Sequence, residues 1–547
     1  MGEETSLIEA LVTGIICLML VAAVTTMASK RLSKLPLTIA LVFVGIAISA
    51  LSDRVPALGL ISSSVHLTPQ LVLYVFIPTL IFESAFNMNA REVSRNIWPI
   101  MMLAGPGLIL STLIIGGMMA WMTHFDLMVA MLLGAILSAT DPVAVIAIFK
   151  QLGVPERLTV LVEGESLFND ATSLVVATIL LGILVKGDFS AAVVGDGVVQ
   201  FFVVFFGGVL VGWLLAIIAG QTLGRIEEDP LVEITLTTIL AYFSFIVADH
   251  VFHVSGIMAV VASGLTIGSW GRSKISPSTE AFMKHFWEYL AYLANAFIFL
   301  MVGMEMNLVT LWHSIGLIAA VALAMLVSRA AVVFLLVPLV GKLPGSEPTS
   351  LPWQGVMYWG GLRGAIAIAI VLSLPHFAYK DTLIAVVLGA VLFTLIVEGL
   401  SIEPMVKWLG LDALSLPDQL VKLEGDRHAR QEGLARLDTV VSGGMFSTRV
   451  AENIRARSLR EIAELDAELK KLHTSMDASE ARELLAMRCL VREKARYREL
   501  FARGLINEWA YRELDNTVNV QLDGVRHQAA LPSARFETSF GKALDLF

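Results

Sequence analysis

The sequence predicts an all-α protein with many transmembrane helices, followed by a soluble helical domain. The 547-residue chain is 56% hydrophobic and only 16% charged, and its mean hydropathy is +0.75. Apolar runs recur from Leu7 to about Trp408, and most approach the roughly 20 residues that span a bilayer as a helix. From about Gly410 the chain becomes rich in charged residues. We therefore expect a membrane domain at 1–409 and a cytoplasmic helical domain at 410–547.

Thirteen apolar segments are expected to cross the membrane as helices, because each is longer than the ~10 residues of a barrel strand. Cytoplasmic loops of membrane proteins are enriched in lysine and arginine. With the N-terminus outside, the inner loops hold twelve of these residues and the outer loops three. The odd number of spans then places the C-terminal domain in the cytoplasm, and we expect the plasma membrane as the location. The segments are 7–28, 36–51, 69–86, 98–122, 127–149, 158–184, 198–219, 230–251, 254–268, 284–304, 311–340, 353–373 and 382–402.

The sixth span contains the most unusual stretch of the chain, Glu-Gly-Glu-Ser-Leu-Phe-Asn-Asp from Glu163 to Asp170. Ionisable groups inside a membrane are costly, so each is a functional candidate. On a helix, Glu163, Ser166 and Asp170 share one face, while Glu165 and Asn169 form an adjacent stripe. This helix alone therefore offers one polar stripe for a ligand and one for its support.

The fifth span contains a second candidate, Asp141, directly before Pro142. Proline interrupts a helix and disfavours helical backbone in the residue before it. Broken helices near the middle of the membrane are a recurring way to build ion sites in transporters, although a simple proline kink is the alternative. Oxygen ligands suit a hard cation such as Na⁺, and no His/Cys cluster has the spacing of a zinc site. A carboxylate there can hold a proton or a cation, but not both well.

Two further spans carry charges that need an explanation. Arg329 lies in the eleventh span, with Glu165 as its expected partner in an ion pair that orients helices. Arg363 lies in a glycine-interrupted part of the twelfth span. The glycines indicate either a second broken helix of an inverted repeat or close helix packing. Glu83 ends the third span and is expected to face the bundle.

Three motifs together resemble the monovalent cation:proton antiporters, in the branch of NhaP-type and eukaryotic sodium/proton exchangers. They are Ala139–Pro142, Gly164–Asp170 and Gly360–Gly364. The resemblance implies an NhaA/NhaP-like fold with inverted repeats, in which broken fifth and twelfth helices cross near the site. It also implies a homodimer, in which a six-helix transport bundle moves as an elevator beside a dimerisation domain.

The resemblance also implies roles for individual residues. Asp170 is the acid that alternates between proton and Na⁺. Asn169 replaces the first of the paired aspartates found in the electrogenic branch, which implies electroneutral one-for-one exchange. Glu165 and Arg329 match a structural ion pair, and Glu83 matches a family acid without a settled role. We expect Glu83, and Arg363 of the third motif, to be supporting residues. The matching cation ligands are Thr140 (through its backbone carbonyl), Asp141, Ser166 and Asp170.

The expected function is secondary active exchange of Na⁺ for H⁺, with Li⁺ or K⁺ as alternative cations. A K⁺/H⁺ antiporter of the same fold is the main alternative. A cation channel is less favoured because no filter-like repeat is present. An intramembrane hydrolase with Ser166 as nucleophile lacks a nearby base, since His124 and His250 lie at span ends. We expect no enzyme activity, no cofactor and no nucleic-acid partner.

The tail carries a weaker resemblance. The stretch from Tyr497 to Leu514 is similar to cytoplasmic tails of some bacterial and plant exchangers. This similarity suggests a regulatory role for residues 410–547 as a hypothesis. If it is right, deletion of 411–547 changes the pH dependence or turnover of exchange, and unchanged values would contradict it.

Overall fold

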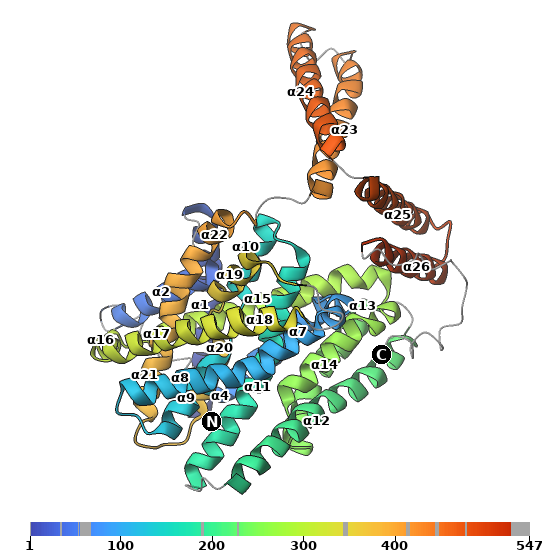
Figure 1. Cartoon of the computed structure of the whole chain (residues 1–547). Coiled ribbons are helices and arrows are strands. Elements are labelled where there is room, and N and C mark those ends of the chain that lie inside the picture. The colour runs from blue at the N-terminus through green and yellow to red at the C-terminus, as the bar shows by residue number, and fades with distance from the viewer. Residues whose placement is uncertain are drawn as a thin grey trace. The chain divides into compact units, whose positions relative to one another are not determined.

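The computed structural model describes residues 2–32, 36–52, 54, 67–186, 191–226, 229–342, 348–411, 416–442, 448–475 and 478–526. The regular structure within these ranges is helical and includes no strand, as predicted. The chain divides into two compact units, Met1–Asp412 and Ala413–Phe547 (Figure 1). Each unit is described separately below.

Ten helical stretches of the first unit are long and apolar enough to cross a membrane, among the residues described. Two further apolar helices are shorter, α2 (Leu37–Leu51) and α14 (Gly256–Gly268). The remaining predicted span is divided between α19 (Leu351–Trp359) and α20 (Ala365–Ser373). Each predicted span thus coincides largely with helix, while the count of thirteen membrane crossings stays a prediction.

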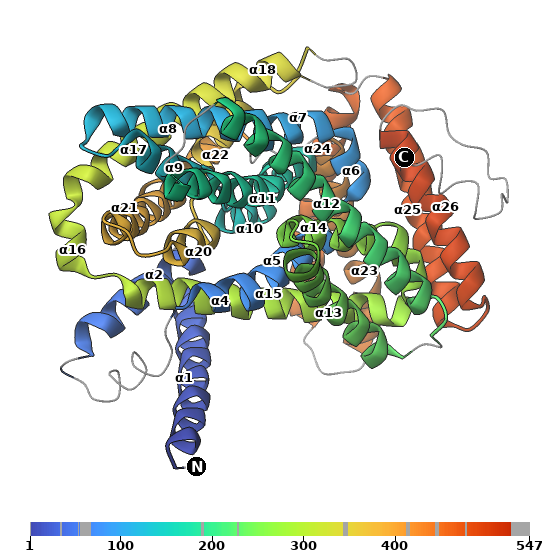
Figure 2. The same ribbon diagram turned by 90° about the horizontal axis from the view of Figure 1, so that it is seen from below.

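The helices of the first unit form two groups, and most contacts of each helix are with members of its own group. We name these groups the first bundle and the second bundle. In Figure 2, α8, α9, α17, α20 and α21 of the second bundle lie on one side, and α12, α13 and α14 of the first lie on the other. The first bundle comprises α1 (Gly2–Leu32), α2, α4–η1–α5 (Pro69–Asn87), α12 (Ala191–Leu223), α13–η3 (Pro230–Val251), α14 and α15 (Pro277–Glu305). The second comprises α7–η2–α8 (Ile97–Met122), α9 (Leu127–Ser138), α10 (Val143–Leu152), α11 (Glu156–Lys186), α17–η5–α18 (Ile315–Val340), α19, α20 and α21–η6–α22 (Lys380–Trp408).

Glycine allows α2 and α15 of the first bundle to approach each other closely. A Cβ atom at Gly45 of α2 would lie 2.2 Å from the carbonyl oxygen of Leu300 in α15. A Cβ atom at Gly303 would lie 2.3 Å from the carbonyl oxygen of Val42. Small residues at such contacts let backbones pack directly on each other in membrane proteins. The α2–α15 pair therefore forms a tightly packed part of this bundle.

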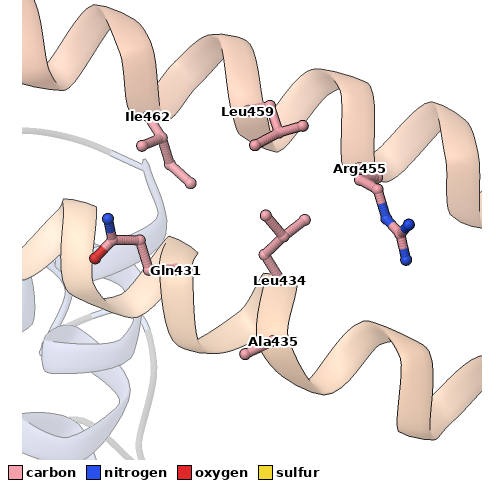
Figure 3. A pocket seen from close by; sticks show the side chains of 6 residues that line it. All are labelled: Gln431, Leu434, Ala435, Arg455, Leu459 and Ile462. Atoms are coloured by element: carbon pink, nitrogen blue, oxygen red, sulfur yellow. The ribbon is translucent and has the colours of Figure 1, made fainter.

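The second unit contains two helical hairpins, formed by α23 (Leu416–Ser442) with α24 (Thr448–Ser475) and by α25 (Ala478–Ala502) with α26 (Glu508–Arg526). A small core of three leucines connects α23, α24 and α25, and Arg488 pairs with Glu424 at 2.7 Å. An open groove lies between α23 and α24, with the side chain of Leu434 directed toward that of Leu459 (Figure 3). The residues that line this groove are Gln431, Leu434, Ala435, Arg455, Leu459 and Ile462.

Candidate cation site

Two interrupted helices meet in the second bundle. Helix α9 ends at Ser138 and α10 begins at Val143, so the chain between them is not helical, as Pro142 predicts. The twelfth predicted span is also interrupted, between Trp359 and Ala365. The backbone N–H of Asp141 donates to the carbonyl oxygen of Leu362 at 2.7 Å. This bond directly connects the two interruptions, and the glycines of the twelfth span mark a break rather than packing alone.

The carboxylate of Asp141 lies at the N-termini of α10 and α20, the half-helices that follow the two interruptions. Its Oδ1 accepts the backbone N–H of Val143 at 3.1 Å, and the carboxylate also interacts with the backbone N–H of Ala365. Helix N-termini carry unpaired N–H groups and a partial positive charge, so they stabilise an anion. A Cβ atom at Gly364 would lie 1.9 Å from Oδ2 of Asp141. Only glycine therefore allows the carboxylate to occupy this place.

We expect Gly364→Ala to lower exchange and thermal stability together, because the added methyl must displace the Asp141 carboxylate. Overpacking of this kind costs roughly 1–3 kcal/mol. Gly117→Ala in α8 is the matched control, since a Cβ atom there has no neighbour within 4 Å. Ion flux in proteoliposomes and melting in detergent measure both effects. Wild-type flux and melting temperature for Gly364→Ala would contradict the described contact.

Helix α11 covers the interruption of the fifth span with polar side chains. The hydroxyl of Ser166 donates to the carbonyl oxygen of Thr140. The amide Nδ2 of Asn169 donates to the carbonyl oxygen of Ser138 at 3.1 Å and to Oγ1 of Thr140 at 3.4 Å. A broken helix leaves carbonyl groups without their usual donors, and buried ones need replacements. The structure therefore brings Thr140, Ser166 and Asn169 together at the break.

Asp170 lies one helical turn beyond Ser166 and interacts electrostatically with Asp141. Its side chain is half-buried, whereas Asn169 beside it is buried. Among the residues that the structure describes, no group donates a hydrogen bond to the Asp170 carboxylate. Asp141 and Asp170 thus form a pair of neighbouring carboxylates, and that of Asp170 has no hydrogen-bond donor among the described residues.

Glu165 and Arg329 form the predicted ion pair. Nη1 of Arg329 bonds to Oε1 of Glu165, and Nη2 donates to Oε2 at 3.0 Å. The guanidinium also donates from Nε and Nη2 to the carbonyl oxygen of Met357 at 3.1 and 2.8 Å. Both side chains are buried. The pair therefore fixes α11 against α17 and against the end of α19, next to the break.

Arg363 reaches the same break from the other interrupted helix. Its Nη1 donates to the carbonyl oxygen of Ala139 at 3.3 Å, and its backbone N–H donates to Oγ1 of Thr394 at 3.2 Å. Thr394 begins η6 (Thr394–Glu398), and the buried Glu398 at its end interacts electrostatically with Arg363. Sequence reasoning gave Thr394 and Glu398 no role. For Glu398 a signal was available, because an acid within the apolar thirteenth span needs an explanation.

Glu83 lies apart from these residues. It belongs to α5 of the first bundle and accepts a hydrogen bond at 2.8 Å from Asn87, one turn further along the same helix. Its charged neighbours include Glu163 and Lys150. The structure therefore brings eight of the nine candidate residues together around the crossing and leaves Glu83 beside it.

Interrupted helices that meet at half-buried carboxylates are typical of ion-coupled membrane transporters. A family model for the transmembrane part of sodium/hydrogen exchangers matches residues 16–408. The chain belongs to the sodium/hydrogen exchanger family, which confirms the resemblance carried by the three motifs. It is a multi-pass membrane protein of an antiporter family, and that family is not a class of enzymes.

Curated relatives and solved structures agree with this assignment. The chain is 36% identical to the Na(+)/H(+) antiporter ApNhaP of Aphanothece halophytica over 416 residues, which cover 75% of this chain and 77% of that protein. It is 32% identical to the Na(+)/H(+) antiporter NhaS2 of Synechocystis sp. over 516 residues, which cover 91% of each. The sodium proton antiporter MjNhaP1 of Methanocaldococcus jannaschii has the same fold, with a TM-score of 0.57 at 22% identity. That match covers 73% of this chain and all of the solved one.

Proposed function

We propose that this protein exchanges Na⁺ for H⁺ one for one and that the two ions compete for Asp170. The observation that carries the proposal is the position of the Asp141–Asp170 carboxylate pair at the crossing of two interrupted helices. Na⁺ would be held by the carboxylates of Asp141 and Asp170, the hydroxyl of Ser166 and the carbonyl of Thr140. These hard oxygen donors suit Na⁺. Relatives that are antiporters of Na⁺ and H⁺ support this choice of cation.

The neutral side chain at position 169 supports the one-for-one ratio. The Nδ2 group of Asn169 donates hydrogen bonds to the carbonyl of Ser138 and the hydroxyl of Thr140, so its role in the site is structural. Asp170 is then the acid on this helix that takes up a proton when the cation leaves. Each cycle moves one positive charge in each direction.

The remaining parts of the proposal concern motion and placement. The second bundle would carry the site across the membrane as an elevator, beside a first bundle that forms the contact with a second copy. The N-terminus would lie outside the plasma membrane and the tail in the cytoplasm, as the distribution of lysine and arginine indicates. Tight packing of α2 on α15 in the first bundle is consistent with a stationary part.

The decisive experiment measures proton flux in proteoliposomes against gradients of Na⁺, Li⁺ and K⁺. We expect Na⁺ to drive proton movement that is reversed when the gradient is reversed. Proton flux with K⁺ alone would instead indicate the K⁺/H⁺ antiporter. Absence of flux with all three cations, in liposomes that contain folded protein, would contradict the proposal.

The one-for-one ratio predicts that membrane voltage leaves the final Na⁺ gradient unchanged. One net charge per cycle would couple about 2.3 kcal/mol per 100 mV to transport, which is roughly fifty-fold in the ion ratio at equilibrium. Imposing such a voltage with a K⁺ gradient and valinomycin, at a fixed pH difference, measures the effect. A large shift of the Na⁺ ratio would contradict electroneutral exchange.

A further inference from the structure

One hydrogen bond near the site joins the two bundles. The hydroxyl of Ser84, on α5 of the first bundle, donates to Oε1 of Glu163, on α11 of the second bundle, at 2.9 Å. The hydrogen bonds of the site described above all lie within the second bundle. The Ser84–Glu163 bond instead links the helix that carries Asp170 to the neighbouring bundle.

Glu163 has no part in the site itself, although it lies on the same helix face as Asp170. It precedes Asp170 by seven residues, which is about two turns or ~10.5 Å along the axis, and this spacing returns to the same face. Its side chain is half-buried, and its charged neighbours include Glu83 on α5 and Lys150 on α10. A half-buried acid within a predicted membrane span is costly and calls for a role.

We propose that Glu163 is a further positioning residue for exchange, and that its bond to Ser84 holds the second bundle in one of its two positions. This inference rests on the elevator motion of the proposed function. A sliding movement of α11 along α5 by more than about 2 Å takes the two oxygen atoms, 2.9 Å apart, out of hydrogen-bond range. The bond must therefore break in one half of each cycle and form again in the other. Hydrogen bonds to a carboxylate are stronger than neutral ones, so the bond biases the balance between the two positions.

The first test joins the two residues covalently. Ser84→Cys and Glu163→Cys are combined with Cys17→Ser and Cys489→Ser, which remove the two native cysteines. We expect oxidation to the disulfide to lower Na⁺-driven proton flux by about tenfold or more, and a reductant to restore it, because an elevator cannot move while its bundles are bonded. Flux that persists in the oxidised protein would overturn the proposal.

A pair of serines inside the second bundle provides the matched control. The hydroxyls of Ser111 in α8 and Ser328 in α17 lie 2.7 Å apart, and both residues are buried. A disulfide from Ser111→Cys and Ser328→Cys should leave flux unchanged, since both helices move together. An equal loss in this control would also overturn the proposal, because the loss would then follow from linking any two helices.

The second test does not depend on cysteines. Ser84→Ala and Glu163→Ala each remove the bond, so each should shift the apparent affinity for Na⁺ on one side of the membrane by about tenfold. The double variant should show the same shift as either single one, and Glu163→Gln, which keeps an acceptor oxygen but loses the charge, should give a smaller shift than Glu163→Ala. Additive shifts would overturn the proposal. Exchange by the cysteine-free parent protein reports on the proposed function separately, so the two ideas can fail independently.

Discussion

Replacing Asp170 with asparagine is expected to reduce Na⁺/H⁺ exchange to the level of empty liposomes. The substitution keeps the size of the side chain and removes the carboxylate for which the two ions are proposed to compete. The Asp170 carboxylate accepts no hydrogen bond among the described residues, so the neutral amide breaks no contact that supports the fold. We therefore expect Asp170→Asn to reach the membrane and to melt close to the wild-type temperature. Proton flux in proteoliposomes and melting in detergent separate these two expectations.

Asp249 offers a control of the same chemical type at a distance from the site. It lies in η3 (Val247–Val251) of the first bundle, where it accepts a hydrogen bond from the hydroxyl of Tyr74 at 3.0 Å. Asp249→Asn should keep its exchange activity. Near-normal Na⁺-driven flux for Asp170→Asn would refute the assignment of that carboxylate. Equal losses in both variants would show that removing an acid in this protein acts through something other than the site.

Glu165→Gln is expected to give the largest loss of stability of any single conservative change described here. It leaves Arg329 buried with its charge uncompensated, and breaking a buried ion pair in this way costs roughly 3–5 kcal/mol. Replacing both partners at once with apolar side chains, as in Glu165→Leu with Arg329→Met, removes the stranded charge. The double variant should therefore melt at a higher temperature than Glu165→Gln, which thermal unfolding in detergent measures.

An exposed ion pair provides the contrast. Lys407 and Glu403, one turn apart in α22 (Gly399–Trp408), form a salt bridge of 2.6 Å with both side chains partly exposed. Such pairs contribute only about 0–1 kcal/mol, so Lys407→Ala should have little effect on melting. Melting of Glu165→Gln at the wild-type temperature would contradict the structural role of the buried pair. If the double variant is no more stable than Glu165→Gln, the loss of stability in Glu165→Gln results from altered packing rather than from the unpaired charge.

Much of the site could be predicted because its signals are local. A carboxylate directly before a proline in an apolar span marks a break, and the structure has the break at Asp141. An arginine in the middle of a span needs an acid, and the predicted acid, Glu165, is its partner. The spans follow from composition, because a helix in lipid needs a continuous apolar stretch. Helices α2 and α14 are short, and hydropathy alone does not separate such helices from buried ones.

The remaining features depend on residues that are distant in the sequence. The bond between the N–H of Asp141 and the carbonyl of Leu362 has no local signal, since backbone groups are the same at every residue. The bond from Arg363 to Ala139 joins residues 224 positions apart. Periodicity placed Glu163 on one helix face with Ser166 and Asp170, but it does not reveal which helix that face meets. Ser166 donates a hydrogen bond to the carbonyl of Thr140, whereas Glu163 accepts one from Ser84 in the other bundle.

The close approach of Gly364 to Asp141 limits how the cation preference of the proposed site can be redesigned. The backbones of the two interruptions form two sides of the site, and the bond between the N–H of Asp141 and the carbonyl of Leu362 holds them together. Gly364, beside the Asp141 carboxylate, has no space for a larger side chain. Variation is left mainly to the third wall, where α11 presents a hydroxyl and an amide. We expect that variants selected for growth on a larger alkali metal will carry their changes at positions 166 and 169 rather than in the glycine-rich segment.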